Sequence, residues 1–227
     1  MKHAKLLGSS IGLLLIVAGL IIGVGPVIGL IQRSQADATA IQAWEHGSPS
    51  HISPSQDATP NTCAASTAPS SDYMLVTFPS LPQYGYALVA GNGNWSLLND
   101  RSAVHWYQSP APGGQGNIIV AFHREPDFEY INELNTQQTV QVQDRQCNVY
   151  SYTITGKWVL APSQVTQLDG TSGYNLTMIT CTPWWQDYDR IVWRATLTAV
   201  NGKPFTPPPS TGTTHAPSKG ASQPTFS

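Results

Sequence analysis

Residues 118–124 read IIVAFHR, and residues 175–183 read NLTMITCTP. Both are short apolar runs bounded by turn-forming or charged residues, a pattern that predicts buried β-strands. Each run ends in a reactive side chain, His123 in the first and Cys181 in the second. The two strands therefore predict a sheet that carries two reactive side chains at its rim.

Further strands are predicted on either side of these two runs. Residues 139–142 alternate between polar and apolar positions, as do residues 148–155, and the turn-like residues 144–146 join them. Residues 191–197 form another apolar run, and short helices are expected at 96–100 and 127–134. Many short strands separated by Pro and Gly turns predict an all-β domain, a closed or nearly closed β-barrel.

The composition excludes several classes of protein. Of 227 residues only 11% are charged, and the net charge is −2. Without a basic surface, neither nucleic-acid binding nor polybasic attachment to anionic lipid is expected. The hydrophobic share is 41%, with seven Trp, so part of the chain must form a packed core.

The chain divides into four predicted segments. Residues 6–31 are a run of 26 without a charge, long enough as a helix to cross a bilayer, so residues 1–33 are expected to be a single-pass membrane anchor. Residues 34–72, rich in Ala, Ser, Thr and Pro, are expected to be a spacer. Residues 73–200 form the folded domain, and residues 201–227 a Pro/Ser/Thr-rich flexible tail.

The membrane segment has a rival interpretation. Ala36-Asp37-Ala38 fits the small-x-small pattern of a signal-peptide cleavage site, although the apolar run is longer than such peptides usually carry. Lys2 and Lys5 before the run favour an inside amino terminus. Under either interpretation the folded domain is exported, and we expect it on the outer side of the cell membrane.

The chain has three cysteines, so at most one intramolecular disulfide can form. Cys63 and Cys147 either pair with each other or are two incidental thiols, and the sequence does not decide between these. Cys181 is the candidate nucleophile, because it ends a strand and is followed by Thr182-Pro183.

His123 and Arg190 are the other candidate site residues. His123 ends its strand, and Arg190 opens the strand that follows Cys181, nine residues later. Taken singly, each has an ordinary explanation: a small buried hydrophobe for Cys181, a solvated turn residue for His123, and a surface partner of Asp187 or Asp189 for Arg190. His105 is expected to serve packing.

The combination of these motifs resembles the sortase family. Residues 104–124 (VHWYQSPAPGGQGNIIVAFHR) contain a Pro-Gly-x-x-Gly-Asn turn and an apolar strand that ends in a His-Arg pair. Residues 175–183 resemble the strand that ends in the sortase Cys, and residues 189–197 (DRIVWRATL) open with an Arg. The chain departs from the family at Phe122, where a small residue is usual, and at Met178 and Ile179. It lacks an Asp-Pro-aromatic lid, which makes it more similar to classes D and E.

The resemblance implies an eight-stranded β-barrel and transpeptidation at a Leu-Pro-x-Thr-Gly type sorting signal. It gives catalytic roles to His123, Cys181 and Arg190, and we place Ala121, Phe122 and Thr180 as candidates for the substrate groove. The implied partners are secreted proteins with a C-terminal sorting signal and an amine acceptor of the cell wall or a pilus. No cofactor and no metal are expected, since the acidic residues between 125 and 133 are typical of a solvated short helix.

Two other functions are compatible with the sequence. The chain could be an exported barrel that binds extended peptides without catalysis, with Phe122 marking a degenerate site. It could also be a surface adhesion or stalk module, given its Pro-rich spacer and tail. The intact set of His, Cys and Arg favours the enzyme.

Overall fold

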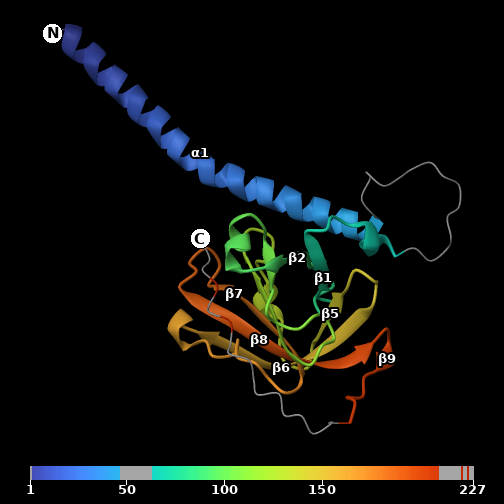
Figure 1. The fold of residues 1–227 in the computed structure, drawn as a ribbon. Coiled ribbons are helices and arrows are strands. Elements are labelled where there is room, and N and C mark those ends of the chain that lie inside the picture. Colours follow the sequence, from blue (N-terminus) through green and yellow to red (C-terminus); the bar gives the residue numbers. More distant parts are fainter. Residues whose placement is uncertain (1, 47–62, 210–220, 222–223, 225–227) are drawn as a thin grey trace, which may run out of the picture.

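A computed structural model describes residues 2–46, 63–209, 221 and 224 of the chain. Its centre is a closed β-barrel, with a long helix lying across one end (Figure 1). The strands are β1 (Asp72–Thr77), β2 (Ala87–Gly93), β3 (Ala103–Trp106), β4 (Gly116–Phe122), β5 (Thr139–Gln143), β6 (Val149–Leu160), β7 (Tyr174–Thr182), β8 (Asp189–Val200) and β9 (Lys203–Pro204).

The barrel closes through the pairing of β6 with β8. The strands follow the order β6-β5-β1-β2-β3-β4-β7-β8, and the two-residue β9 extends the sheet beyond β8. Most neighbours are antiparallel, but β2 with β3 and β4 with β7 are parallel pairs. The expected eight-stranded barrel is confirmed, and closure leaves none of these eight strands with an open edge.

Alternation along the strands sorts their side chains into two apolar clusters. Val120 and Phe122 of β4, together with Met178 of β7, point into the barrel and belong to its main core. Ala121 and Ile179, at the intervening positions, point outward. We call this second cluster the outer apolar face; it consists of Trp95, Leu98, Val104, Ile119, Ala121, Leu168, Ile179 and Val192.

The short helices lie in the connections between strands. They are η2 (Ala64–Thr67), η3 (Trp95–Asn99), η4 (Ile131–Glu133) and η5 (Pro162–Gln164). The helix expected at 96–100 is found as η3. The helix expected at 127–134 is reduced to η4, in which the Glu133 N–H bonds to the Tyr130 carbonyl, and the Arg124 guanidinium donates to the Glu129 carbonyl at 2.6 Å just before it.

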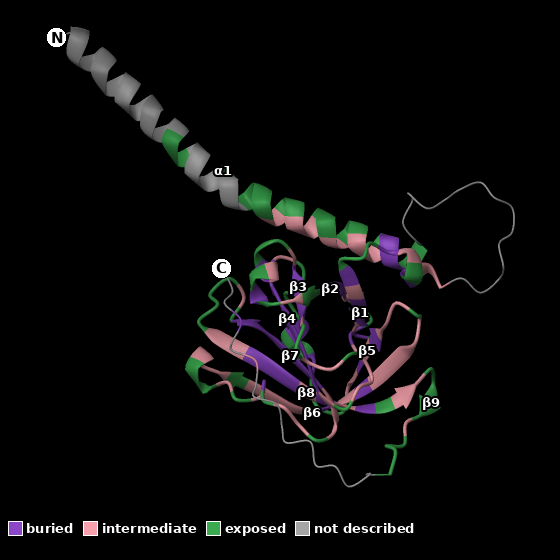
Figure 2. Ribbon diagram, viewed as in Figure 1, coloured by how far each residue is buried: buried purple, intermediate pink, exposed green. Residues whose placement is uncertain are grey.

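Helix α1 (Lys2–His46) does not end where the anchor was expected to end. Residues 35–46 contain neither Gly nor Pro, so the helix continues through the first part of the expected spacer. Its end is fixed by Trp44, which is only 1% exposed and donates from Nε1 to Gln143 Oε1 at 2.7 Å. Figure 2 shows this buried turn of α1 beside β1 and β2. The spacer therefore begins as a docked helix rather than as irregular chain.

The remaining terminal segments are only partly described. Residues 47–62 of the expected spacer and most of residues 210–227 of the expected tail lie outside the described residues, as do most side chains of residues 6–31. Within the described part of the chain, no helix combines the length and the apolarity needed to cross a membrane.

A disulfide ties the segment before β1 to the barrel. Cys63 and Cys147 are bonded, with Cα atoms 5.7 Å apart and a sequence separation of 84. Next to it, Arg145 donates to the backbone carbonyls of Ser66, Ala68, Pro69 and Asp72. Of the two alternatives that the sequence left open, the structure has the paired cysteines, and Cys181 is the free thiol.

Reduction of this disulfide should destabilise the domain. A crosslink that closes a loop of 84 residues removes entropy from the unfolded chain, so we expect the free energy of unfolding to fall by about 2 to 4 kcal/mol with dithiothreitol. Urea unfolding with and without the reductant measures this. The double variant Cys63→Ser/Cys147→Ser is the control, since its midpoint should not respond to dithiothreitol. An unchanged midpoint of the natural chain would contradict the prediction.

Candidate active site

The parallel pairing of β4 with β7 brings the expected site residues to one rim of the barrel. The last paired residues of these strands are Ala121 and Ile179. Cys181 lies two positions further along β7, and His123 directly follows the last residue of β4 with its backbone N–H still bonded to the Ser102 carbonyl, so both continue on the same side of the sheet as that pair. On the other flank of β7, Cys181 is paired directly with Arg190 of β8 in the antiparallel register. The three residues thus share the end of the outer apolar face.

The Cys181 thiol is buried and holds its proton. The residue is 2% exposed, and this burial raises the pKa of the thiol to about 12. Among the charged neighbours, the Arg190 guanidinium acts to lower the pKa, whereas the carboxylates of Asp187 and Glu125 act to raise it. Desolvation outweighs the attraction of Arg190, so the resting side chain is the neutral thiol.

A backbone carbonyl of η3 orients the His123 ring. Its Nε2 lies 2.8 Å from the Leu98 carbonyl oxygen, and because a carbonyl can only accept, Nε2 carries the proton of the neutral ring. The lone pair is then on Nδ1. Burial, more than the nearby Arg33, lowers the pKa of His123, while the Leu98 carbonyl and Asp187 oppose that shift. The resting imidazole is therefore neutral and can accept a proton at Nδ1.

Arg190 is held by the start of its own strand. Its Nη1 donates to the Asp187 carbonyl at 2.8 Å and to the Asp189 carbonyl at 3.0 Å. The sequence suggested an interaction with the carboxylates of these two residues as the ordinary explanation, but these two contacts are to their backbone oxygens. A planar guanidinium fixed in this way keeps a defined direction beside the thiol.

Arg124 and Glu125, which directly follow His123, connect the loop after β4 to the loop after β7. This role was not predicted from the sequence. Arg124 is buried and donates from Nη1 to Thr182 Oγ1 at 2.9 Å, and its guanidinium lies over the Trp184 ring at 5.9 Å. Glu125 Oε1 accepts from the Trp185 backbone N–H at 2.8 Å. The His-Arg pair was the available signal, since a charged residue in a buried position needs partners.

The three candidates for the substrate groove, Ala121, Phe122 and Thr180, lie on two different sides of the barrel wall. Ala121 belongs to the outer apolar face, next to the site. Phe122 is fully buried in the barrel core and packs against Phe78 and Phe128, and Thr180 is buried and donates to the Phe122 carbonyl at 2.5 Å. The alternation of the strands turns Phe122 and Thr180 into the barrel, whereas Ala121 points outward, and the assignment of the three to a substrate groove stays a prediction. The bulk of Phe122 is therefore no sign of a degenerate site.

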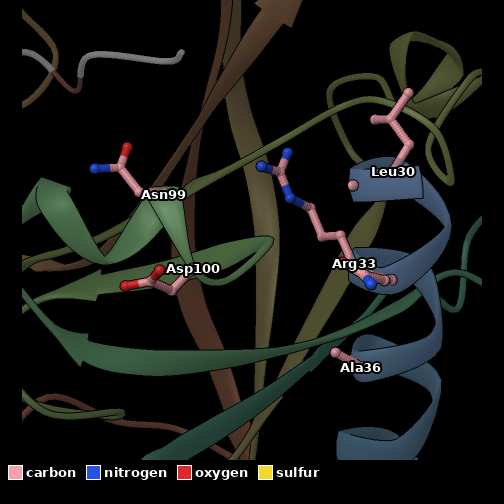
Figure 3. A pocket seen from close by; sticks show the side chains of 7 residues that line it. Leu30, Arg33, Ala36, Asn99 and Asp100 are labelled. Carbon is pink, nitrogen blue, oxygen red and sulfur yellow. The ribbon is translucent and has the colours of Figure 1, made fainter. Parts of the chain in front are cut away.

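A cavity of about 630 Å³ lies between α1 and the end of η3. It is lined by Gly29, Leu30, Gln32, Arg33, Ala36, Asn99 and Asp100. Figure 3 shows the Arg33 side chain extending from α1 toward Asn99 and Asp100. Asn99 follows Leu98, whose carbonyl contacts His123, so the helix and the site share this short element.

The acidic residues after β4 make separate contacts rather than one cluster. Glu125 accepts from Trp185, Asp127 from the Ser34 hydroxyl at 3.0 Å, and Glu133 from the Tyr84 hydroxyl at 2.9 Å. Among the described residues, no group of three or more His, Cys, Asp or Glu could hold a metal ion. His105 is buried between Asn92 and the Pro110 carbonyl and stacks on Tyr73, as expected for a packing residue.

Comparison with known proteins identifies the family of this fold. The family model described as Sortase domain matches residues 79–198. A search of curated proteins finds no match.

Solved sortase structures share the fold. Sortase E from Streptomyces avermitilis is 23% identical with a TM-score of 0.51, covering 59% of this chain and 95% of that one. Sortase A of Listeria monocytogenes is 22% identical with a TM-score of 0.50, covering 60% and 92%. Group B Streptococcus Pilus Island 1 Sortase C2 is 19% identical with a TM-score of 0.51, covering 58% and 76%. These similarities show that this chain has the fold of the three structures, and the TM-scores are nearly the same for sortases E, A and C2.

The reactivity of Cys181 should increase steeply with pH. Only the thiolate is alkylated, and its fraction grows tenfold for each pH unit below the pKa, which is raised to about 12. We expect the rate of iodoacetamide labelling to rise about tenfold per unit from pH 7 to 10, whereas a free thiol with a pKa of about 8.5 levels off in this range. Labelling is followed by mass spectrometry, with Cys181→Ala as the blank. A plateau below pH 8 would show instead that the site holds a thiolate.

Proposed function

The chain belongs to the sortase family of cysteine transpeptidases, and we propose that it cleaves a C-terminal sorting signal of Leu-Pro-x-Thr-Gly type and transfers the secreted protein to an amine at the cell surface. The observation that carries the proposal is the direct pairing of Cys181 with Arg190, on the face that continues toward His123. This arrangement offers a nucleophile, a guanidinium and a neutral imidazole to one peptide bond.

The first half of the reaction forms a thioacyl-enzyme. The Cys181 proton moves to His123 Nδ1 as the sulfur attacks the carbonyl carbon of the scissile bond, and a C–S bond forms. The C–N bond then breaks, and the imidazolium returns the proton to the leaving amine. Because thiol and imidazole both start neutral, this proton transfer accompanies the attack instead of preceding it.

The second half reverses the same steps with a new amine. The incoming amine attacks the thioester while the neutral His123 takes its proton, and the proton then returns to the departing Cys181 sulfur. No net charge is created across the cycle, which suits a site that is largely removed from water.

Arg190 is the proposed partner of the substrate carbonyl. Charge develops on the carbonyl oxygen when the sulfur attacks, and preorganised donors at that position stabilise the transition state. The guanidinium has five N–H groups, so it can keep its contacts to Asp187 and Asp189 while it donates to the substrate.

We also propose that α1 anchors the enzyme to the outer side of the cell membrane. Residues 6–31 carry no charge, and within this run Val24, Val27 and Ile28 are exposed on the helix, with about half of their surface open. Lipid would cover such side chains. The proposed partners follow from this placement: secreted proteins with a sorting signal, and an amine of the cell wall or a pilus.

A library of sorting-signal peptides tests the proposal. We expect at least one peptide to add the mass of its acyl part to the natural chain, and we expect Cys181→Ala to show no adduct while its unfolding midpoint remains close to that of the natural chain. Turnover with an amine acceptor should release the ligated peptide. Peptide binding without any adduct would instead favour a non-catalytic peptide-binding barrel.

Arg190→Lys separates geometry from charge. Lysine keeps the positive charge but offers a point donor instead of a planar fork. If Arg190 acts as an oxyanion donor, we expect turnover to fall about 30- to 1000-fold, or about 2 to 4 kcal/mol, with little change in thermal stability. A turnover within twofold of the natural enzyme would show that charge alone is enough. Steady-state kinetics beside a thermal melt measure both quantities.

A further inference from the structure

One described residue of the C-terminal tail lies on the outer apolar face. Ala221 is partly buried and packs against this cluster, and Pro224 is buried. Ala121, Ile179 and Val192 of the same cluster each precede or follow one of the three site residues by two positions on their strands. The face that the tail contacts therefore continues directly to Cys181.

The connection is long enough to make this return. After β9, Phe205 packs edge-on against Tyr174 with ring centroids 4.8 Å apart, at the end of the barrel away from Arg190. β8 has 12 residues, or about 40 Å, and the 16 residues from Phe205 to Ala221 reach up to about 55 Å when extended. The tail can thus run back along the barrel to the site.

The chemistry of the tail suits this surface. Residues 220–227 read GASQPTFS and contain no charged side chain, so binding of such a segment to an apolar face would bury no ionic side chain. The proline restricts the backbone, which reduces the entropy lost on binding. A proline and a threonine in a short peptide are also features of the sorting signal that the proposed function assigns as substrate.

We propose that the C-terminal tail binds the site as an intramolecular competitor of the peptide substrate. This inference rests on the proposed function for the identity of the competing peptide, but the contact of Ala221 does not. A tethered segment meets its own binding face at an effective concentration in the millimolar range, so even a weak contact is substantially occupied. A sorting signal must displace the tail. The apparent affinity of the enzyme for the sorting signal is therefore its intrinsic affinity multiplied by the fraction of chains in which the tail is not bound.

Ala221→Arg in the full chain should release the tail, because a bulky cation cannot replace a methyl group on the outer apolar face. Pro208→Arg is the matched control, since it adds the same charge to the same tail at an exposed position. Equal thermal melts of the two variants establish that both are folded. The tail contact is read from the NMR signals of the indole N–H groups of Trp95, Trp106 and Trp158, which belong to the cluster or pack against it.

Competition is read from the labelling of Cys181 by the chloromethyl ketone of Leu-Pro-Ala-Thr, compared with labelling by iodoacetamide. We expect Ala221→Arg to shift the indole signals and to raise the rate of peptidyl labelling about three- to tenfold over the natural chain. Pro208→Arg should do neither. A synthetic peptide of residues 217–227, added to Ala221→Arg at millimolar concentration, should reverse both effects.

The remaining outcomes distinguish the two proposals. Identical indole spectra and identical labelling rates for both variants would overturn the tail contact. Shifted indole signals with an unchanged peptidyl rate would show that the tail binds but does not compete, and rates that depend on protein concentration would assign the tail to a second copy. If no variant reacts with the peptidyl reagent while all react with iodoacetamide, the proposed function fails, and the indole signals still decide whether the tail binds.

Discussion

The parallel pairing of β4 with β7 is the constraint on which the site depends. Parallel neighbours end at the same edge of a sheet, so residues far apart in the chain, His123 and Cys181, arrive at one rim. Such a pair requires a long crossover, and here β5 and β6 form that crossover while they also complete the barrel. Closure through β6 and β8 then fixes Arg190 beside the thiol, because β8 is held on both flanks.

Burial at this rim sets the protonation of the site more strongly than charge does. Burial raises the pKa of Cys181, although Arg190 acts to lower it. Burial also lowers the pKa of His123, although Asp187 acts to raise it. Both groups are therefore neutral at rest. A neutral thiol reacts slowly with electrophiles in solution. Reaction therefore requires a bound peptide whose carbonyl carbon lies close to the Cys181 sulfur.

The sequence predicts the parts of this molecule that carry a periodic or chemical signal. The strands of residues 118–122 and 176–180 are apolar runs, and the resemblance to sortases gave the closed barrel. β1 to β3 were not predicted: β3 has only four residues, and β2 contains two glycines, which weaken a strand pattern. The Leu98 carbonyl that orients His123 is invisible in sequence because every residue has one. The contact of Arg124 with the Glu129 carbonyl is equally absent from any sequence pattern.

The continuation of α1 beyond the uncharged run has a consequence for how the enzyme stands on the cell. Only Gln32 separates Ile31, the last residue of that run, from Arg33 in the cavity beside η3. The helix contacts the barrel again at Trp44, about 17 Å further along its axis. With residues 6–31 in the bilayer as proposed, a continuous helix connects the bilayer to the barrel and limits the orientations of the barrel relative to the membrane. Its catalytic rim then stays close to the lipid headgroups, at the height where the carboxyl end of an exported protein leaves the membrane.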